Sequence, residues 1–144
     1  MNDKKYESLK LCNQLCFPLY AASREIIKAY RPHLEEIGLT YTQYITMLVF
    51  WEYEQISVKD LGKMLYLDSG TLTPVLKSLE AKGYIKRSRS SKDERVLIAK
   101  LTESGKALKE RASAVPGKMS DCVNLTPEEA GALYKILYKI LKTE

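Results

Sequence analysis

Residues 57 to 101 carry the pattern that most constrains how this chain folds. Ser57 is a typical helix-capping residue, and the apolar residues after it recur at helical spacing through residues 58–66. Asp68-Ser69-Gly70-Thr71 is a second group of capping and turn residues, and it opens a helical segment that ends at Gly83. Two short helices joined by a brief polar turn form a helix-turn-helix.

The period of the sequence changes after Gly83. Residues 84–87 and 95–101 have the composition of strands, and residues 88–94 between them form a charged loop without apolar side chains. These segments predict a β-hairpin with a long basic tip. A helix-turn-helix followed by such a hairpin is a winged helix-turn-helix, so the expected fold class is mainly α with a small β-hairpin wing.

Helical periodicity continues on both sides of this central unit. Residues 8–31 favour a helix that Pro18 either kinks near Gln14 or starts, because proline lacks an N–H and clashes with the carbonyl four residues back. Pro32 and Gly38 are expected to close it. Thr40 precedes a second apolar stretch, residues 44–51. The remaining expected helices are a segment from Thr102 towards Val115 that Pro116-Gly117 bends or ends, and a segment capped by Thr126 with Leu133, Ile136, Leu137, Ile140 and Leu141 on one face.

Composition excludes several classes of protein. The 144 residues suit one domain, and 45% hydrophobic content is too high for a disordered chain. No apolar stretch approaches the ~20 residues of a membrane span, and no signal peptide is visible, so we expect a cytoplasmic protein.

Three cysteines are too few for a disulfide scaffold. One histidine and the lack of a Cys-x-x-Cys pair argue against a metal site, and we expect no cofactor.

The excess positive charge lies entirely in the central unit. Residues 57–100 contain ten Lys/Arg and five Asp/Glu, and this difference equals the formal net charge of +5 of the whole chain. A focused basic patch suits a polyanion, either nucleic acid or an acidic membrane surface. The alternative is a solvated basic face without a partner.

The winged helix supplies specific candidates for contact with double-stranded DNA. The first turns of the second helix read base edges in the major groove, and here they carry short hydroxyls that reach bases or phosphates, unless they serve only as caps. In the hairpin, arginines suit a narrow minor groove, and Asp93 would orient Arg95 or form an ordinary surface ion pair with it. The candidates are Ser69, Thr71, Thr73, Lys77, Arg87, Arg89, Lys92, Asp93 and Arg95.

The same segments resemble a known family. Residues 67–80 resemble the recognition helix of MarR-family regulators, Lys92-Asp93-Glu94-Arg95 resembles their wing motif, and residues 101–105 resemble the start of their next helix. Residues 13–17, Tyr20, Tyr30 and residues 39–44 resemble the OhrR branch of organic-hydroperoxide sensors and the related thiol-switch regulators of the MgrA/SarZ type.

This resemblance implies a homodimer that binds a pseudo-palindromic operator, and repression is the family's usual mode. Two recognition helices related by a two-fold axis read half-sites about one turn apart, which also favours a dimer on geometric grounds. We expect residues 8–38 and 102–144 to supply dimerisation helices and residues 40–101 to form the DNA-binding lobe.

The resemblance also implies a thiol switch at Cys16. The thiolate attacks a peroxide, and a helix that begins near Pro18 would place Cys16 where the helix dipole favours the anion. Tyr30 and Tyr41 match tyrosines that hydrogen-bond the reactive sulfur across the dimer interface, and Tyr20 lies one turn from Cys16. Cys122 matches a second cysteine that, in some members, resolves the sulfenate, whereas others use a low-molecular-weight thiol. The alternative for Cys16 is an inert, buried cysteine, and Cys12 is expected to pack.

Three other functions remain to be weighed. An enzyme is not expected, because the sequence has no nucleophile elbow, Gly-rich phosphate loop or metal-ligand cluster, although a reactive Cys16 would suit a peroxidase. A MarR-type regulator released by a small phenolic or lipophilic ligand would leave Cys16 incidental. A protein-interaction module fits the concentrated basic charge least well.

Overall fold

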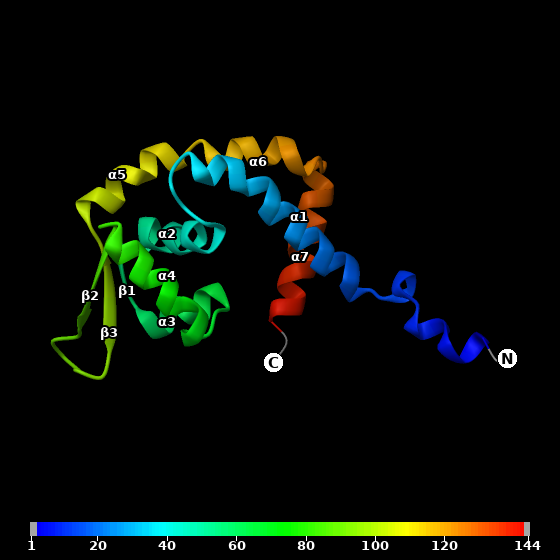
Figure 1. Cartoon of the computed structure of the whole chain (residues 1–144), viewed down its shortest axis with the longest axis horizontal. Helices are drawn as coiled ribbons and strands as arrows, with labels where there is room; N and C mark the ends of the chain where they lie inside the picture. The colour runs from blue at the N-terminus through cyan, green and yellow to red at the C-terminus, as the bar shows by residue number, and fades with distance from the viewer. Residues whose placement is uncertain (1–2, 143–144) are drawn as a thin grey trace.

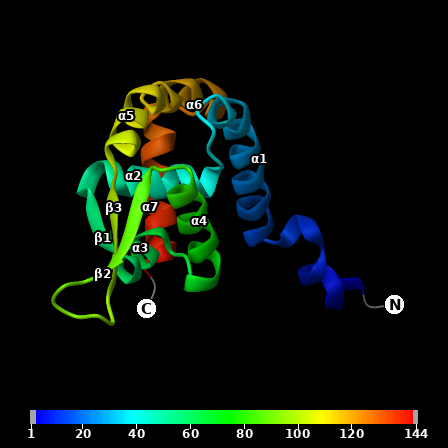
Figure 2. The same ribbon diagram turned by 60° about the vertical axis from the view of Figure 1, so that its left-hand side comes forward.

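The computed structural model describes residues 3–142, and most of them are helical (Figure 1). Two 3₁₀ helices, Asp3–Leu9 and Leu11–Asn13, precede the first α-helix and project away from the rest of the chain in both views (Figures 1 and 2). The remaining elements are α1 (Cys16–Glu35), α2 (Tyr41–Tyr53), β1 (Gln55–Ser57), α3 (Val58–Leu65), α4 (Ser69–Ala81), β2 (Ile85–Arg89), β3 (Leu97–Leu101), α5 (Glu103–Ala112), α6 (Val115–Val123) and α7 (Pro127–Leu141).

The central unit confirms the predicted helix-turn-helix and hairpin. Ser57 and Asp68 cap α3 and α4 by accepting the backbone N–H of Asp60 and Thr71, and Gly83, the second residue after the end of α4, adopts φ 81°. β2 and β3 pair antiparallel, with Arg87 opposite Ala99. The sequence did not predict β1, a three-residue strand that adds to the other edge of β3 and gives the sheet order β1-β3-β2.

Of the two outcomes predicted for Pro18, the structure shows a helix that begins next to it and not a kinked helix from residue 8. α1 starts at Cys16, so Pro18 lies in its first turn, where the missing N–H has no intrahelical partner to lose. The prediction that Pro32 closes the helix is wrong, because α1 runs through Pro32 to Glu35. Gly38, with φ 70°, lies in the turn that leads to α2.

The C-terminal helices form an arch over the winged unit (Figure 1). The segment predicted to run from Thr102 towards Val115 ends at Ala112, and Pro116 lies in the first turn of a separate helix, α6, which packs along α1. Thr126 caps α7 in a capping box with Glu129, as predicted.

The hydrophobic core lies between α2, α3, α4 and the sheet, with α5 and α6 closing it. Its fully buried members include Met47, Phe50, Leu61, Leu72 and Leu76. This packing holds α4 and the hairpin in one rigid unit. Within residues 3–142, no helix is long and apolar enough to cross a membrane.

The helices at the two ends of the chain keep apolar side chains exposed. None of the fifteen residues of α7, all of them described, is buried, although the helix carries a clear apolar face. The exposed apolar residues of these helices include Leu19, Ile26 and Ile27 of α1 and Leu133, Ile136, Ile140 and Leu141 of α7. An apolar surface of this extent marks an interaction site.

Candidate nucleic-acid interface and thiol site

The first turns of α4 present the predicted hydroxyls at the surface. Asp68 caps the helix, with its Oδ1 accepting the backbone N–H of Thr71 at 2.7 Å, and bonds from Thr71 hold the pKa of the Asp68 carboxyl below its ordinary value. Ser69 is exposed and Thr73 is half-buried one turn on, while Lys77 is exposed. Because the cap is Asp68, capping does not explain the hydroxyl of Ser69.

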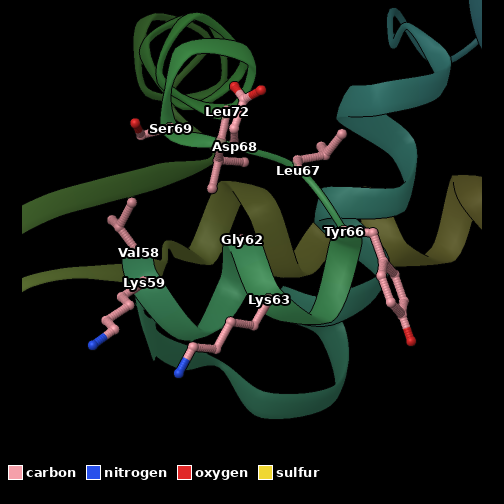
Figure 3. Close-up of a pocket in the computed structure, with 9 residues that line it drawn as sticks. All are labelled: Val58, Lys59, Gly62, Lys63, Tyr66, Leu67, Asp68, Ser69 and Leu72. Carbon is pink, nitrogen blue, oxygen red and sulfur yellow. The ribbon is translucent and has the colours of Figure 1, made fainter. Parts of the chain in front are cut away.

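A shallow hollow of about 670 Å³ lies where α3 turns into α4 (Figure 3). Lys59 and Lys63 extend from the same side of α3, and Tyr66 extends from its C-terminal end with left-handed backbone, φ 54°. Lys59 and Lys63 belong to the basic patch of residues 57–100, but they are not among the DNA-contact residues predicted from the sequence. Their i, i+4 spacing could have identified them, because residues four apart lie on the same face of a helix.

The tip of the hairpin carries three exposed cations, Arg89, Lys92 and Arg95. The predicted pair with Asp93 is confirmed, because the guanidinium of Arg95 donates to both carboxylate oxygens at 3.1 and 3.3 Å. These bonds lower the pKa of the Asp93 carboxyl. The Arg95 side chain is 91% exposed, so the pair fixes a cation at the surface without removing it from solvent.

Arg87 differs from the other cations of the hairpin. Its side chain is only 19% exposed, and its guanidinium donates to Oε1 of Glu80 in α4 at 3.2 Å. The backbone N–H of Arg87, on the outer edge of β2, donates to Oε2 of the same carboxylate at 2.8 Å. Both bonds lower the pKa of Glu80. DNA contact by Arg87 stays a prediction, and the Glu80 pair gives it a competing role that ties the wing to α4.

Cys16 is the first residue of α1, and its thiol is exposed. Tyr20 lies one turn on and is 57% exposed, with the Arg24 guanidinium 5.5 Å above its ring and donating to its hydroxyl at 3.2 Å. Cys12, in the preceding 3₁₀ helix, is exposed too, so the expectation that it packs is wrong within this chain. The alternative of a buried Cys16 does not hold within this chain either.

Tyr30, Tyr41 and Tyr44 form an aromatic cluster at the other end of α1. The ring of Tyr30 lies 5.0 Å from that of Tyr41 and 5.8 Å from that of Tyr44, between centroids. Burial raises the pKa of all three phenols, which keeps them neutral and able to donate hydrogen bonds. Tyr44, whose side chain is buried in the core, was not among the site residues predicted from the sequence.

One protomer does not bring Cys16 and this cluster together. Tyr30 is the fourteenth residue after Cys16 in α1, which places it roughly 21 Å farther along the helix axis. Of the three tyrosines assigned to the sensing site, Tyr20 alone lies within about one turn of Cys16 along α1. A site that contains both Cys16 and the cluster therefore needs a second chain.

Cys122 is exposed on α6, beside a largely apolar hollow of about 490 Å³. α1, α6 and α7 supply its lining, which includes Ile26, Met119 and Leu133. All three cysteines are free thiols. Within residues 3–142, no group of three or more His, Cys, Asp or Glu side chains is placed to hold a metal ion.

The known proteins to which this chain is similar are described as transcriptional regulators. Residues 28–112 match the family model described as transcriptional regulator SarA/Rot. The chain is 47% identical to the organic hydroperoxide resistance transcriptional regulator of Bacillus subtilis, over 98% of this chain and 96% of that protein. It is 46% identical to the HTH-type transcriptional regulator SarZ of Staphylococcus aureus, over 86% of this chain and 84% of that protein.

A solved structure of AbfR of Staphylococcus epidermidis also matches. Reduced AbfR bound to DNA superposes with a TM-score of 0.77 at 38% identity, over 97% of each chain. The overoxidized form bound to DNA gives a TM-score of 0.76. The match extends through the end helices as well as the winged unit.

Proposed function

Because this chain belongs to the SarA/Rot family of transcriptional regulators, whose fold is the MarR-type winged helix, we propose that it is a DNA-binding regulator that senses organic hydroperoxides through Cys16. Oxidation of Cys16 releases the operator, and the unoxidised protein acts as a repressor. The relatives are named as transcriptional regulators, and the name of the hydroperoxide-resistance regulator favours this response over release by a phenolic or lipophilic ligand.

The functional unit is a homodimer formed by residues 8–38 and 102–144, which leaves residues 40–101 as the DNA-binding lobe. The exposed apolar faces of α1 and α7 support this assignment, because apolar surface removed from water contributes about 25 cal/mol per Å². A second copy is the occupant that such a face fits when the bound DNA is itself two-fold symmetric.

The sensing site combines Cys16 and Tyr20 of one protomer with Tyr30 and Tyr41 of the other. The thiolate attacks the terminal oxygen of the hydroperoxide, the O–O bond breaks, and the alkoxide leaves as an alcohol after protonation. Cys16 is thereby oxidised to sulfenic acid and the hydroperoxide is reduced. Neutral phenols donate to the thiolate, so the loss of its charge changes their hydrogen bonds.

The DNA-binding residues are the hydroxyls and lysine of α4 and the exposed cations of the hairpin, with Asp93 orienting Arg95. Arg87 was also assigned to DNA contact from the sequence, but its bonds to Glu80 favour a role in tying the wing to α4. Exposure of Ser69, Thr71 and Lys77 supports base or phosphate contact, and the held geometry of Arg95 supports minor-groove insertion. Such a regulator acts in the cytoplasm, where the bacterial chromosome lies.

The observation that carries the proposal is the exposed Cys16 thiol at the first residue of α1, in a chain 47% identical over almost its whole length to a hydroperoxide-resistance regulator. The test is binding of a duplex from the gene's own upstream region before and after one equivalent of cumene hydroperoxide. Wild-type protein and Cys12→Ser, the matched control, should release the duplex. Cys16→Ser should stay bound, and its release would contradict the proposal.

Cys122 has the role of resolving thiol in this account. The Cys122 thiolate of one protomer attacks the Cys16 sulfenic acid of the other, which forms a disulfide and water. A non-reducing gel after peroxide treatment should show a dimer-sized band that is lost in Cys122→Ser. A monomer-sized band alone from wild-type protein would assign this step to a low-molecular-weight thiol.

A further inference from the structure

Gln43 is a buried polar residue in the first turn of α2, with 7% of its surface exposed. Its Oε1 accepts the backbone N–H of Thr40 at 3.0 Å, which completes the capping box of α2. Its Nε2 donates to Oγ of Ser78, in α4, at 2.9 Å. Capping needs only the oxygen of this amide, so the nitrogen is available to join α2 to α4.

Lys82 strengthens this link from the C-terminal end of α4. Its Nζ donates to Oε1 of Gln43 at 3.1 Å and also to the carbonyl oxygen of Gly38, in the connection between α1 and α2. Gln43 therefore joins the connection, α2 and the recognition helix in one network. Charge-assisted bonds of this kind are stronger than neutral ones.

Across residues 3–142, the hydrogen bonds that connect α2 with α4 all involve the Gln43 side chain. Both helices also contribute apolar side chains to the shared core, among them Met47 and Phe50 of α2 and Leu72 and Leu76 of α4, all fully buried. Apolar contacts resist separation but direct no particular register, whereas hydrogen bonds weaken steeply once distance and angle change. The polar network is therefore the part of the interface that fixes how α4 follows α2.

The same turn of α2 carries the tyrosine cluster. Tyr41 lies two residues before Gln43 and contacts Tyr30 and Tyr44 through its ring. A displacement of Tyr41 at the sensing site thus moves the backbone that holds Gln43. Ser78 and Lys82, at the C-terminal end of α4, move with Gln43 because they are hydrogen-bonded to it. The hydroxyls at the N-terminal end of α4 then change position relative to the DNA.

From this geometry we propose that Gln43 is a positioning residue that couples the tyrosine cluster to the recognition helix, an inference that rests on the proposed function. The coupling is a free energy between two sites, measured as the ratio of the dissociation constants for DNA of oxidised and reduced protein. Breaking the link to α4 should reduce this ratio and leave the chemistry at Cys16 intact.

The test uses Ser78→Ala with Lys82→Met, which removes both bonds to α4 and keeps the capping box of α2. Ser78→Thr, which keeps the hydroxyl, is the conservative variant, and Ser120→Ala, an exposed serine of α6, is the matched control. Each protein is titrated onto the duplex reduced and after one equivalent of cumene hydroperoxide. The rate of Cys16 oxidation and the thermal midpoint are measured in parallel.

The expected result is a ratio at least fivefold lower in the double variant, with reduced-state affinity within threefold and the Cys16 oxidation rate within twofold of wild type. Ser78→Thr and Ser120→Ala should keep the wild-type ratio. A double variant that is less stable but keeps the full ratio would overturn the inference and leave Gln43 a structural residue. Ser78→Ala alone gives the same test if the double variant does not fold. A wild-type ratio of one would overturn the proposed function itself.

Discussion

Replacement of Arg87 separates its two competing roles, DNA contact and attachment of the wing. Glu80 accepts two bonds from Arg87, one from the backbone N–H and one from the guanidinium. A hydrogen bond to a charged group contributes about 1.5–3 kcal/mol when buried, and the Glu80 side chain is 37% exposed, so solvent replaces part of this. We therefore expect Glu80→Ala to lower the free energy of unfolding by about 2 kcal/mol, and Arg87→Ala by about 1 kcal/mol because its backbone bond survives.

The assay combines urea unfolding with the salt dependence of DNA binding. Each phosphate contact contributes about −0.9 to the slope of log K against log salt. Arg89→Ala is the matched control on the same strand, and it should make the slope less steep by about 0.9 with a stability change within about 0.5 kcal/mol. Arg87→Ala should leave the slope unchanged and lower stability. A less steep slope with unchanged stability in Arg87→Ala would refute the reasoning and restore Arg87 as a DNA contact.

Three further predictions follow from the packing and from the pKa shifts. A Cβ on Gly105 would lie 2.3 Å from the carbonyl oxygen of Tyr84, so Gly105→Ala should lower the free energy of unfolding, measured in urea, by about 1–3 kcal/mol. Gly117→Ala, whose Cβ meets nothing within 4 Å, should leave it unchanged. Burial raises the pKa of Tyr41, so the stability that its neutral phenol contributes is present below pH 10 and is lost as the pH rises. The difference between the urea midpoints at pH 8 and pH 10.5 should therefore be smaller in Tyr41→Phe than in the wild-type protein. An equal difference in the two proteins would contradict this. The pKa of Glu80 is lowered, so its share is present above about pH 4.5 and is lost in acid; Glu80→Gln should flatten the fall in thermal midpoint between pH 5 and 3.

Local signals in the sequence located most of the helices. Ser57, Asp68, Thr102 and Thr126 each cap the predicted helix, because a cap depends on residues within one turn. The pair between Asp93 and Arg95 was predictable for the same reason, because a single residue separates the two partners in the sequence.

Features that depend on distant partners were missed. β1 has three residues and exists because it pairs with β3, where Gln55 lies opposite Lys100. The bonds of Glu80 to Arg87 and of Gln43 to Ser78 join different elements, so no local pattern reveals them. The start of α1 at Cys16 was one of two outcomes compatible with Pro18, and the choice between them needed the surrounding structure.

The most direct test of the account follows operator release and Cys16 oxidation in the same sample. Cumene hydroperoxide is added in steps of a fraction of one equivalent per protomer, and the anisotropy of a labelled duplex is read at each step. Because residues 11–24 form one tryptic peptide that contains both Cys12 and Cys16, fragmentation of this peptide in the mass spectrometer assigns the modification to one cysteine or the other. We predict that the fraction of DNA released rises with the fraction of Cys16 modified, while Cys12 stays unmodified. Release that precedes Cys16 modification, or complete modification with the duplex still bound, would contradict it.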